Sequence, residues 1–338
     1  MKYKKCVLIY TLLISLTLFF TGCQGDKKGS EEFAAFTRNV FIEEVQCDAI
    51  TLNYTLNHPE DYGITDYTPT FGDFSVEESQ NTYAEIENYL AALNEFNYKS
   101  LTKDQQLTFD ILKEYLELQL SAYEFILYAE ALGPNTGLQA QLPVLLSEYH
   151  FMDKEDVEAY LLLLADLPRY FKQISDFEMQ KSKAGLFMSD TTADSIISQC
   201  EKFIASREDN VMIEVFNDRI ENLSFLSTEE MTSYKEQNQN LVFHSVIPAY
   251  ELLVNQIKAL KGTGTNEGGL CYFPKGKEYY EYLIATTTGS SRSIKEIDKL
   301  LSDGINTSLE NMIAAANAAV RMTISVPIMQ LIMLLSRI

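Results

Sequence analysis

Residues 101–132 read LTKDQQLTFDILKEYLELQLSAYEFILYAEAL, a stretch typical of a long amphipathic helix. Thr102 stands three residues before Gln105, the spacing of a capping box, in which each side chain satisfies a free backbone N–H. Apolar residues then recur on one helical face, namely Leu112, Leu116, Leu120, Tyr123 and Leu127. Gly133 and Pro134 end the pattern, so we predict one helix of about thirty residues, roughly 45 Å long.

The same periodicity continues on both sides of this stretch. Residues 75–96, SVEESQNTYAEIENYLAALNEF, begin with a capping-box serine, and a further helix is predicted from Asp153, with a kink at Pro168. Ser227 opens another helix that runs to about residue 260 and contains Pro248. Alternating runs typical of strands are short. The sequence therefore predicts an all-α fold of long antiparallel helices, with residues 35–310 as one helical body.

The N-terminus has the three parts of a secretory signal. MKYKK is basic, VLIYTLLISLTLFF is apolar, and TGCQG places small residues directly before a cysteine. We predict a lipoprotein signal peptide over residues 1–22, lipid attachment at Cys23 and a flexible polar tether over residues 23–34. An uncleaved transmembrane anchor is the alternative. Both interpretations place the chain at the cell membrane, facing away from the cytoplasm.

The composition is strongly acidic, with 48 Asp and Glu against 27 Lys and Arg. Removing Lys2, Lys4 and Lys5 with the signal would move the formal net charge from −21 to about −24. This charge disfavours nucleic acid as a partner. The three remaining cysteines lie far apart in the sequence and form no CxxC pair, so we expect neither a disulfide framework nor a zinc knuckle, and buried free thiols are the favoured state.

Histidine gives the sharpest test for metal chemistry. His58, His150 and His244 lie some ninety residues apart, and none forms the i, i+4 pair with which one helical face binds zinc. We predict a solvated or capping position for His58, a hydrogen-bonded core position for His244, and a position near a cleft for His150. No metal ligand and no catalytic residue is predicted in this chain.

Two stretches mix polar, aromatic and helix-breaking residues in the way that substrate clefts do. They are GPNTGLQAQLPVLLSEYHF, residues 133–151, and LCYFPKGKEYYEYLIATTTGSSRSIKEI, residues 270–297. Tyrosines have an apolar ring with a polar tip and commonly line such clefts, although packing between helices explains them equally well. The candidate cleft-lining residues are Gln139, Gln141, Glu148, His150, Lys275, Tyr279 and Tyr280.

These two stretches, with TLNYTLNHPEDYGI (residues 51–64) and KSKAGLFMSD (residues 181–190), resemble a known bacterial lipoprotein family, domain of unknown function 885. The resemblance extends from about residue 35 to residue 310. It implies an α-helical, secreted, zincin-like protein of the metallopeptidase or carboxypeptidase kind. In that family zinc is held by an H-E-x-x-P-G-H helix with a further acidic ligand downstream. This chain lacks that motif, so the resemblance implies no cofactor here, with zinc expected in intact relatives.

Residues 311–338 form an apolar tail that contrasts with the rest of the chain. All 48 acidic residues lie before it, and it contains four of the ten methionines. Only 15 residues separate Arg321 from Arg337, fewer than the ~20 that a membrane-spanning helix needs. An interfacial or buried helix is one interpretation. We favour the other, that the gene was truncated or changed frame near residue 312, which leaves the tail foreign to the fold.

Two functions from different classes follow from these patterns. The first is the N-terminal, inactive part of a lipid-anchored zincin-like peptidase. The second is an all-α lipoprotein that binds a peptide or glycan in a helical groove, and a plain envelope scaffold is a third possibility. The expected partners are the membrane, through the N-terminal lipid, and a peptide ligand.

Overall fold

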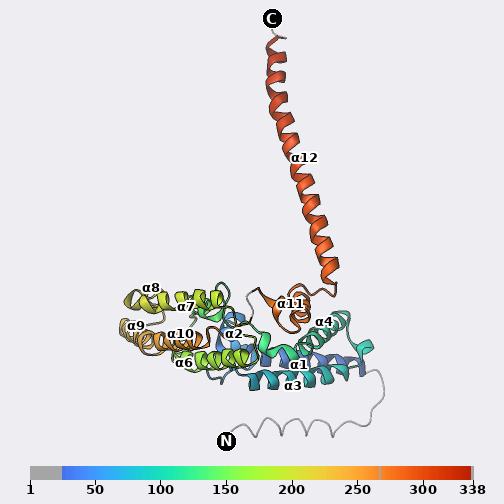
Figure 1. The fold of residues 1–338 in the computed structure, drawn as a ribbon. Helices are drawn as coiled ribbons and strands as arrows, with labels where there is room; N and C mark the ends of the chain where they lie inside the picture. Colours follow the sequence, from blue (N-terminus) through green and yellow to red (C-terminus); the bar gives the residue numbers. More distant parts are fainter. Residues whose placement is uncertain (1–24, 266–267, 336–338) are drawn as a thin grey trace. The chain divides into compact units, whose positions relative to one another are not determined.

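The computed structural model describes residues 25–265 and 268–335 and confirms the all-α fold (Figure 1). No β-strand occurs within these two ranges. The α-helices are α1 (Gly25–Val45), α2 (Ala49–Thr55), α3 (Val76–Asn94), α4 (Lys103–Leu120), α5 (Leu138–Glu148), α6 (Lys154–Lys183), α7 (Asp190–Ala205), α8 (Val211–Ile220), α9 (Thr228–Leu241), α10 (Ile247–Leu260), α11 (Gly276–Thr288) and α12 (Ile294–Leu335). The chain divides into two compact units, with the boundary between Pro274 and Lys275. The predicted single body over residues 35–310 therefore differs from the structure.

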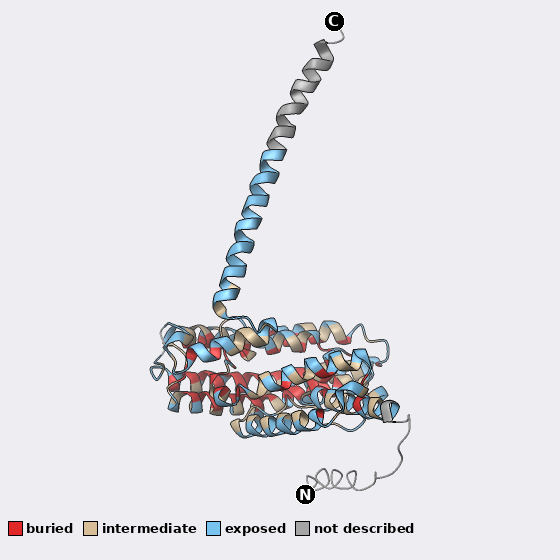
Figure 2. Ribbon diagram, turned by 90° about the vertical axis from the view of Figure 1, so that its right-hand side faces the viewer, coloured by how far each residue is buried: buried red, intermediate tan, exposed pale blue. Residues whose placement is uncertain are grey.

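Helix α6 is the centre of the first unit. Its N-terminus is capped by Asp153, whose carboxylate accepts the backbone N–H of Asp156 at 3.0 Å. Apolar residues fill its inner face, and α10 packs along it. Figure 2 colours the buried residues of the structure red. Phe171 of α6 meets Tyr250 of α10 with ring centroids 4.9 Å apart. Helix α6 continues through Pro168, although proline removes one backbone hydrogen bond there.

A π-helical turn, Val242–Val246, joins α9 to α10. Pro248 has no N–H to donate to the carbonyl of His244, and at the turn the N–H of Ile247 bonds to Val242, five residues back. The predicted helix from Ser227 to about residue 260 is thus continuous but contains this irregular turn. His244 is exposed, so its predicted core position is wrong. The extra residue in the turn rotates its side chain away from the buried face.

A smaller core lies between α1, α3 and α4. Phe33 of α1 is buried and contacts Phe96 edge-on at 5.3 Å and Phe109 of α4 at 6.4 Å. Residues 25–34 are therefore helical, and the predicted flexible tether over residues 23–34 differs from the structure there. The physical reason is that Phe33 brings this segment onto an apolar surface, while the Lys27–Glu31 pair supports the first turns.

The helix predicted for residues 102–132 is shorter than expected. The Thr102–Gln105 capping box is confirmed, but α4 ends at Leu120 and is followed by the 3-10 helix η3 (Tyr123–Tyr128). Ser121 closes the last turn by donating its hydroxyl to the carbonyl of Leu118 at 2.6 Å. The aromatic residues of η3 pack with one another, with Tyr83 of α3 and with Phe273. Tertiary packing thus ends a helix that periodicity alone would extend.

The second unit contains α11 and α12. Ser293 and Glu296 form a capping box at the start of α12, which then runs without interruption from Ile294 to Leu335 (Figure 1). The helix therefore passes through residue 311, the predicted start of the foreign tail. Between residues 298 and 318 its side chains are exposed, including Leu301, Ile305 and Met312.

Candidate functional site

Helix α5 connects a buried N-terminal end to a C-terminal end at the surface. Proline at position 143 cannot donate to the carbonyl of Gln139, four residues earlier. The hydroxyl of Tyr250 donates to that carbonyl instead, at 2.7 Å. The sequence can therefore place a proline inside this helix because a side chain from α10 replaces the missing backbone donor.

The last carbonyls of α5 are satisfied by side chains from distant parts of the chain. A helix leaves its final four C=O groups without intrahelical partners. The Tyr54 hydroxyl, from α2, donates to the carbonyl of Leu145 at 2.9 Å. Arg219, from α8, donates to the carbonyl of Ser147 at 2.6 Å and also to that of Tyr149. A cation at a helix C-terminus is also favoured by the helix dipole.

The residues that follow α5 are held by Asn53. Its side-chain N–H donates to the carbonyl of His150 at 3.0 Å, and its oxygen accepts the N–H of His150 at 2.8 Å. These two hydrogen bonds resemble those between neighbouring β-strands, with the Asn53 amide in place of the backbone of the second strand. The His150 ring stacks on Tyr54, with centroids 5.3 Å apart and planes 28° apart. We call residues 145–151 the clamped segment, because α2 and α8 both fix its backbone.

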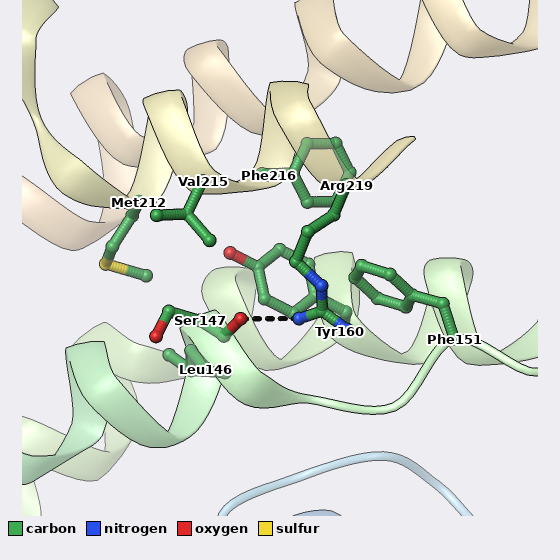
Figure 3. A pocket seen from close by; sticks show the side chains of 8 residues that line it. All are labelled: Leu146, Ser147, Phe151, Tyr160, Met212, Val215, Phe216 and Arg219. Carbon is green, nitrogen blue, oxygen red and sulfur yellow. Dashed lines mark hydrogen bonds between the residues drawn. The ribbon is translucent and has the colours of Figure 1, made fainter. Parts of the chain in front are cut away.

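A pocket of about 170 Å³ lies under the clamped segment (Figure 3). Part of this volume is open to solvent, and none of it is wide enough to hold a water molecule. Its lining consists of Leu146, Ser147, Phe151, Tyr160, Met212, Val215, Phe216 and Arg219. The guanidinium of Arg219 lies 4.5 Å from the Phe151 ring centroid and bonds to Ser147, as the dashed line in Figure 3 shows. This pocket is part of the packing that supports the clamped segment, not a ligand cavity.

Electrostatic effects connect Tyr54, Glu148 and Arg219. Partial burial raises the pKa of the Tyr54 hydroxyl, the Glu148 carboxylate raises it further, and Arg219 opposes both. Burial lowers the pKa of the Arg219 guanidinium. The three groups therefore share one local environment, in which the exposed carboxylate of Glu148 adjoins the exposed Tyr54–His150 stack.

The four candidates predicted from residues 137–151 have different positions. Gln139 is only 3% exposed, and its side-chain nitrogen donates to Gly133 and to Gln199. It therefore holds the loop before α5 and does not line a cleft. Gln141, Glu148 and His150 are exposed, and Glu148 and His150 lie in the clamped segment.

The three candidates from the second unit surround the start of α11. Lys275 is its N-cap residue, is exposed and has a left-handed backbone with φ of 55°. Tyr279 is buried and stacks on Tyr282 with centroids 6.0 Å apart, which favours a packing role. Tyr280 is 46% exposed. Their use as cleft-lining residues stays a prediction.

The zinc centre implied by the family resemblance does not fit the residues that the structure describes. His58 precedes a 3-10 helix and its ring pairs with the Glu60 side chain, His150 follows α5, and His244 lies in the π-helical turn. Within residues 25–265 and 268–335, no three His, Cys, Asp or Glu side chains gather as metal ligands. Of the cysteines in these ranges, Cys200 is buried, but Cys47 and Cys271 are exposed, so buried thiols were predicted correctly for one of three.

The predicted membrane anchor falls in a part of the chain that is not described. Cys23 and the predicted signal peptide lie outside the described residues. Among the helices that are described, none has both the length and the apolar character needed to cross a bilayer.

Sequence reasoning missed Asn53, Tyr54 and Arg219, the three residues that hold the clamped segment. Asn53 and Tyr54 stand in TLNYTLNHPEDYGI, one of the stretches that carry the family resemblance, so a signal was present. Arg219 is part of an ordinary amphipathic pattern in α8, and no local feature distinguishes it. Its role depends on contacts with residues 70 and 72 positions away.

Comparison with known proteins defines the family. Residues 60–326 match the family described as bacterial protein of unknown function (DUF885), a range that begins and ends later than the predicted 35–310. A crystal structure of a candidate lipoprotein from Colwellia psychrerythraea matches this structure with a TM-score of 0.69 and 17% sequence identity. The match covers 82% of this chain and 49% of the Colwellia chain. The likeness shows a common fold, and this chain spans about half of that protein's length. No curated protein matches. Because the family match covers most of the chain, this protein belongs to the DUF885 family of bacterial proteins of unknown function.

Proposed function

We propose that this protein is anchored to the cell membrane by a lipid on Cys23, faces away from the cytoplasm, and binds a peptide. The binding site in this proposal is the surface formed by Tyr54, Glu148 and His150, which we call the Tyr54–His150 surface. Binding, not hydrolysis, is the function assigned to the described residues.

The observation that carries the proposal is the way the clamped segment is built. Tyr54 and Asn53 of α2 and Arg219 of α8 fix its backbone with five hydrogen bonds, which are those to Leu145, Ser147, Tyr149 and, twice, His150. Glu148 and His150 nevertheless remain exposed. A site that holds polar side chains on a rigid backbone loses little conformational entropy when it binds a ligand.

A peptide is the ligand that the family resemblance favours. The family looks like zincin-like metallopeptidases or carboxypeptidases, whose substrates are peptides. Exposed tyrosine and histidine rings with fixed orientation suit peptide side chains, because each presents an apolar face with a polar edge. A glycan could use the same ring faces, and an envelope scaffold would bind neither, so both are outcomes of the test below.

Lipid anchoring is supported by the sequence around Cys23 and by the Colwellia relative, which is named as a candidate lipoprotein. Cells expressing the full chain are extracted with a detergent that separates into two phases. We expect the wild type in the detergent phase and Cys23→Ser in the aqueous phase or retained as the precursor. Equal partition of the processed wild type and the variant would contradict lipidation of Cys23.

Peptide binding is tested by fluorescence anisotropy with a labelled octapeptide, Gly-Lys-Ala-Tyr-Ala-Lys-Leu-Gly. We expect Tyr54→Ala to weaken binding about tenfold, while Tyr115→Ala, which removes an exposed tyrosine from α4, leaves it unchanged. Tyr54→Phe keeps the ring and should bind like the wild type, which separates the ring from the hydrogen bond. No binding by the wild type, or equal losses in Tyr54→Ala and Tyr115→Ala, would contradict the proposed function.

A further inference from the structure

The charged groups around the Tyr54–His150 surface are mostly acidic. The negative charge of the Glu148 carboxylate raises the pKa of the Tyr54 hydroxyl. Asp156, in the first turn of α6, interacts electrostatically with His150 and lies beside Asp153, which caps that helix. A ligand at this surface therefore meets the exposed Glu148 carboxylate, while the half-buried Asp156 carboxylate, which accepts the N–H of Met152, adds negative charge nearby.

Arg219 adds a positive charge that interacts with Tyr54 and Glu148, but the donors of its guanidinium are committed to the backbone. Two of its nitrogens donate to the carbonyls of Ser147 and Tyr149, and its plane lies over the Phe151 ring. These contacts direct its donors at the end of α5, where they complement the helix dipole. The hydrogen bonds of Arg219 thus stabilise the backbone of the clamped segment.

The aromatic part of the surface also favours positive charge. Tyr54 is 37% exposed and is held by the hydrogen bond from its hydroxyl to Leu145. The face of a tyrosine ring attracts lysine and arginine through its negative quadrupole. The chain already contains such a contact in the same unit, where the Arg38 guanidinium lies 4.9 Å from the Tyr62 ring centroid.

We infer that the Tyr54–His150 surface selects cationic peptides, with a lysine or arginine side chain placed against the Tyr54 ring and the Glu148 carboxylate. This inference rests on the proposed function, because it specifies the ligand of the same site. The physical basis is that a rigid ring face and an exposed carboxylate both stabilise a cation, while the nearby arginine is occupied.

The charge series that tests it uses three labelled octapeptides of equal length. They are the lysine probe above and two versions in which both lysines are replaced by glutamine or by glutamate. We expect the lysine probe to bind most tightly, the glutamine probe about fivefold more weakly, and the glutamate probe weakest, with differences that shrink as salt is added. Equal affinities would overturn charge selection and leave peptide binding standing. If none of the three binds, the proposed function fails and the inference fails with it.

A pair of matched variants locates the selection. Glu148→Gln should weaken the lysine probe about threefold and leave the glutamine probe unchanged, since a single exposed ion pair contributes little to affinity. Glu87→Gln removes an exposed carboxylate from α3 and controls for the overall acidity of the chain. Equal effects of the two variants on the lysine probe, or no effect of Glu148→Gln, would overturn the assignment to this surface.

Discussion

Side chains from distant helices form hydrogen bonds with both ends of α5, but the two ends differ in which polar groups stay exposed. At the N-terminal end, Tyr250 and Gln199 bond to Gln139, whose backbone and side chain are both buried. At the C-terminal end, Tyr54 and Arg219 bond to backbone carbonyls, and the side chains of Glu148 and His150 remain exposed. Side chains from distant helices fix both ends, but only the second end keeps polar groups available to solvent.

This difference separates structural polar residues from candidate binding residues. A buried polar group must find partners inside the protein, and one that has found them has no hydrogen bonds left for a ligand. A segment fixed through its backbone keeps its side chains for contacts outside. The predictions that follow test whether the N-terminal end contributes stability alone and whether the C-terminal end contributes binding as well.

The largest effect is expected at the N-terminal end, from Gly137→Ala. A Cβ at residue 137 would collide with the backbone nitrogen of Gly133 and with the side-chain oxygen of Gln139. We expect the free energy of unfolding to fall by about 3 kcal/mol, the upper part of the usual overpacking range, because backbone yields little. Urea denaturation measures it, with the exposed Gln141→Ala as control. A loss of stability as small as that of the control would contradict close packing between Gly137 and Gly133.

Arg219→Ala is expected to have an intermediate effect on stability and a clear effect on binding. It leaves the carbonyls of Ser147 and Tyr149 without their donor, and a hydrogen bond to a charged group contributes about 2 kcal/mol. Arg219→Lys keeps the charge but not the two-pronged geometry, so it should recover only part of the loss.

The matched control for Arg219 is Lys202→Ala, which removes an exposed cation from α7. Denaturation gives the stability of each variant, and anisotropy with the lysine octapeptide gives the binding. The comparison of the two ends of α5 would be contradicted if Arg219→Ala, while still folded, bound the peptide as tightly as the wild type.

The smallest effect concerns Asp156, whose carboxylate accepts the N–H of Met152 just after the clamped segment. Burial raises the pKa of Asp156 above its ordinary 3.8, and the Met152 hydrogen bond opposes this rise. The folded state thus favours the protonated acid. The associated stability is complete below pH 3.8 and is lost as the pH rises through the folded-state pKa.

Asp156→Asn has no group that titrates in this range. Its free energy of unfolding, minus that of the wild type, should therefore increase as the pH rises from about 4 to about 8, as urea titrations at several pH values would show. A difference that decreases over this range would reverse the predicted sign. Asp153→Asn, at the neighbouring cap, serves as the comparison variant.

Much of the fold was predictable, because helices are encoded locally. The capping residues Thr102, Asp153 and Ser227 mark helix starts in the sequence and cap helices in the structure. The end of α4 at Leu120 and the exposure of His244 were not predictable, since both depend on tertiary packing and on helix register that periodicity does not specify.

The candidate site was predictable only in part. Residues 133–151 were singled out for their Gly/Pro breaks, paired glutamines and apolar run, and His150 because it closely follows Glu148 and Tyr149. The residues that hold them lie up to 97 positions away, and no spacing rule connects Asn53 with His150. Gln139 was predicted to line a cleft, and the structure shows it buried. The local sequence does not distinguish a buried glutamine from an exposed one.

The NMR signals of the histidine rings test the proposed binding surface most directly. The chain has three histidines, so ring-labelled protein gives three assignable signals. His58 and His244 are exposed far from α5 along the chain and act as internal controls for non-specific binding. On titration with the lysine octapeptide, we expect the His150 signal to shift while those of His58 and His244 stay in place. Saturating peptide that leaves His150 unmoved, or that shifts all three signals alike, would contradict binding at this surface.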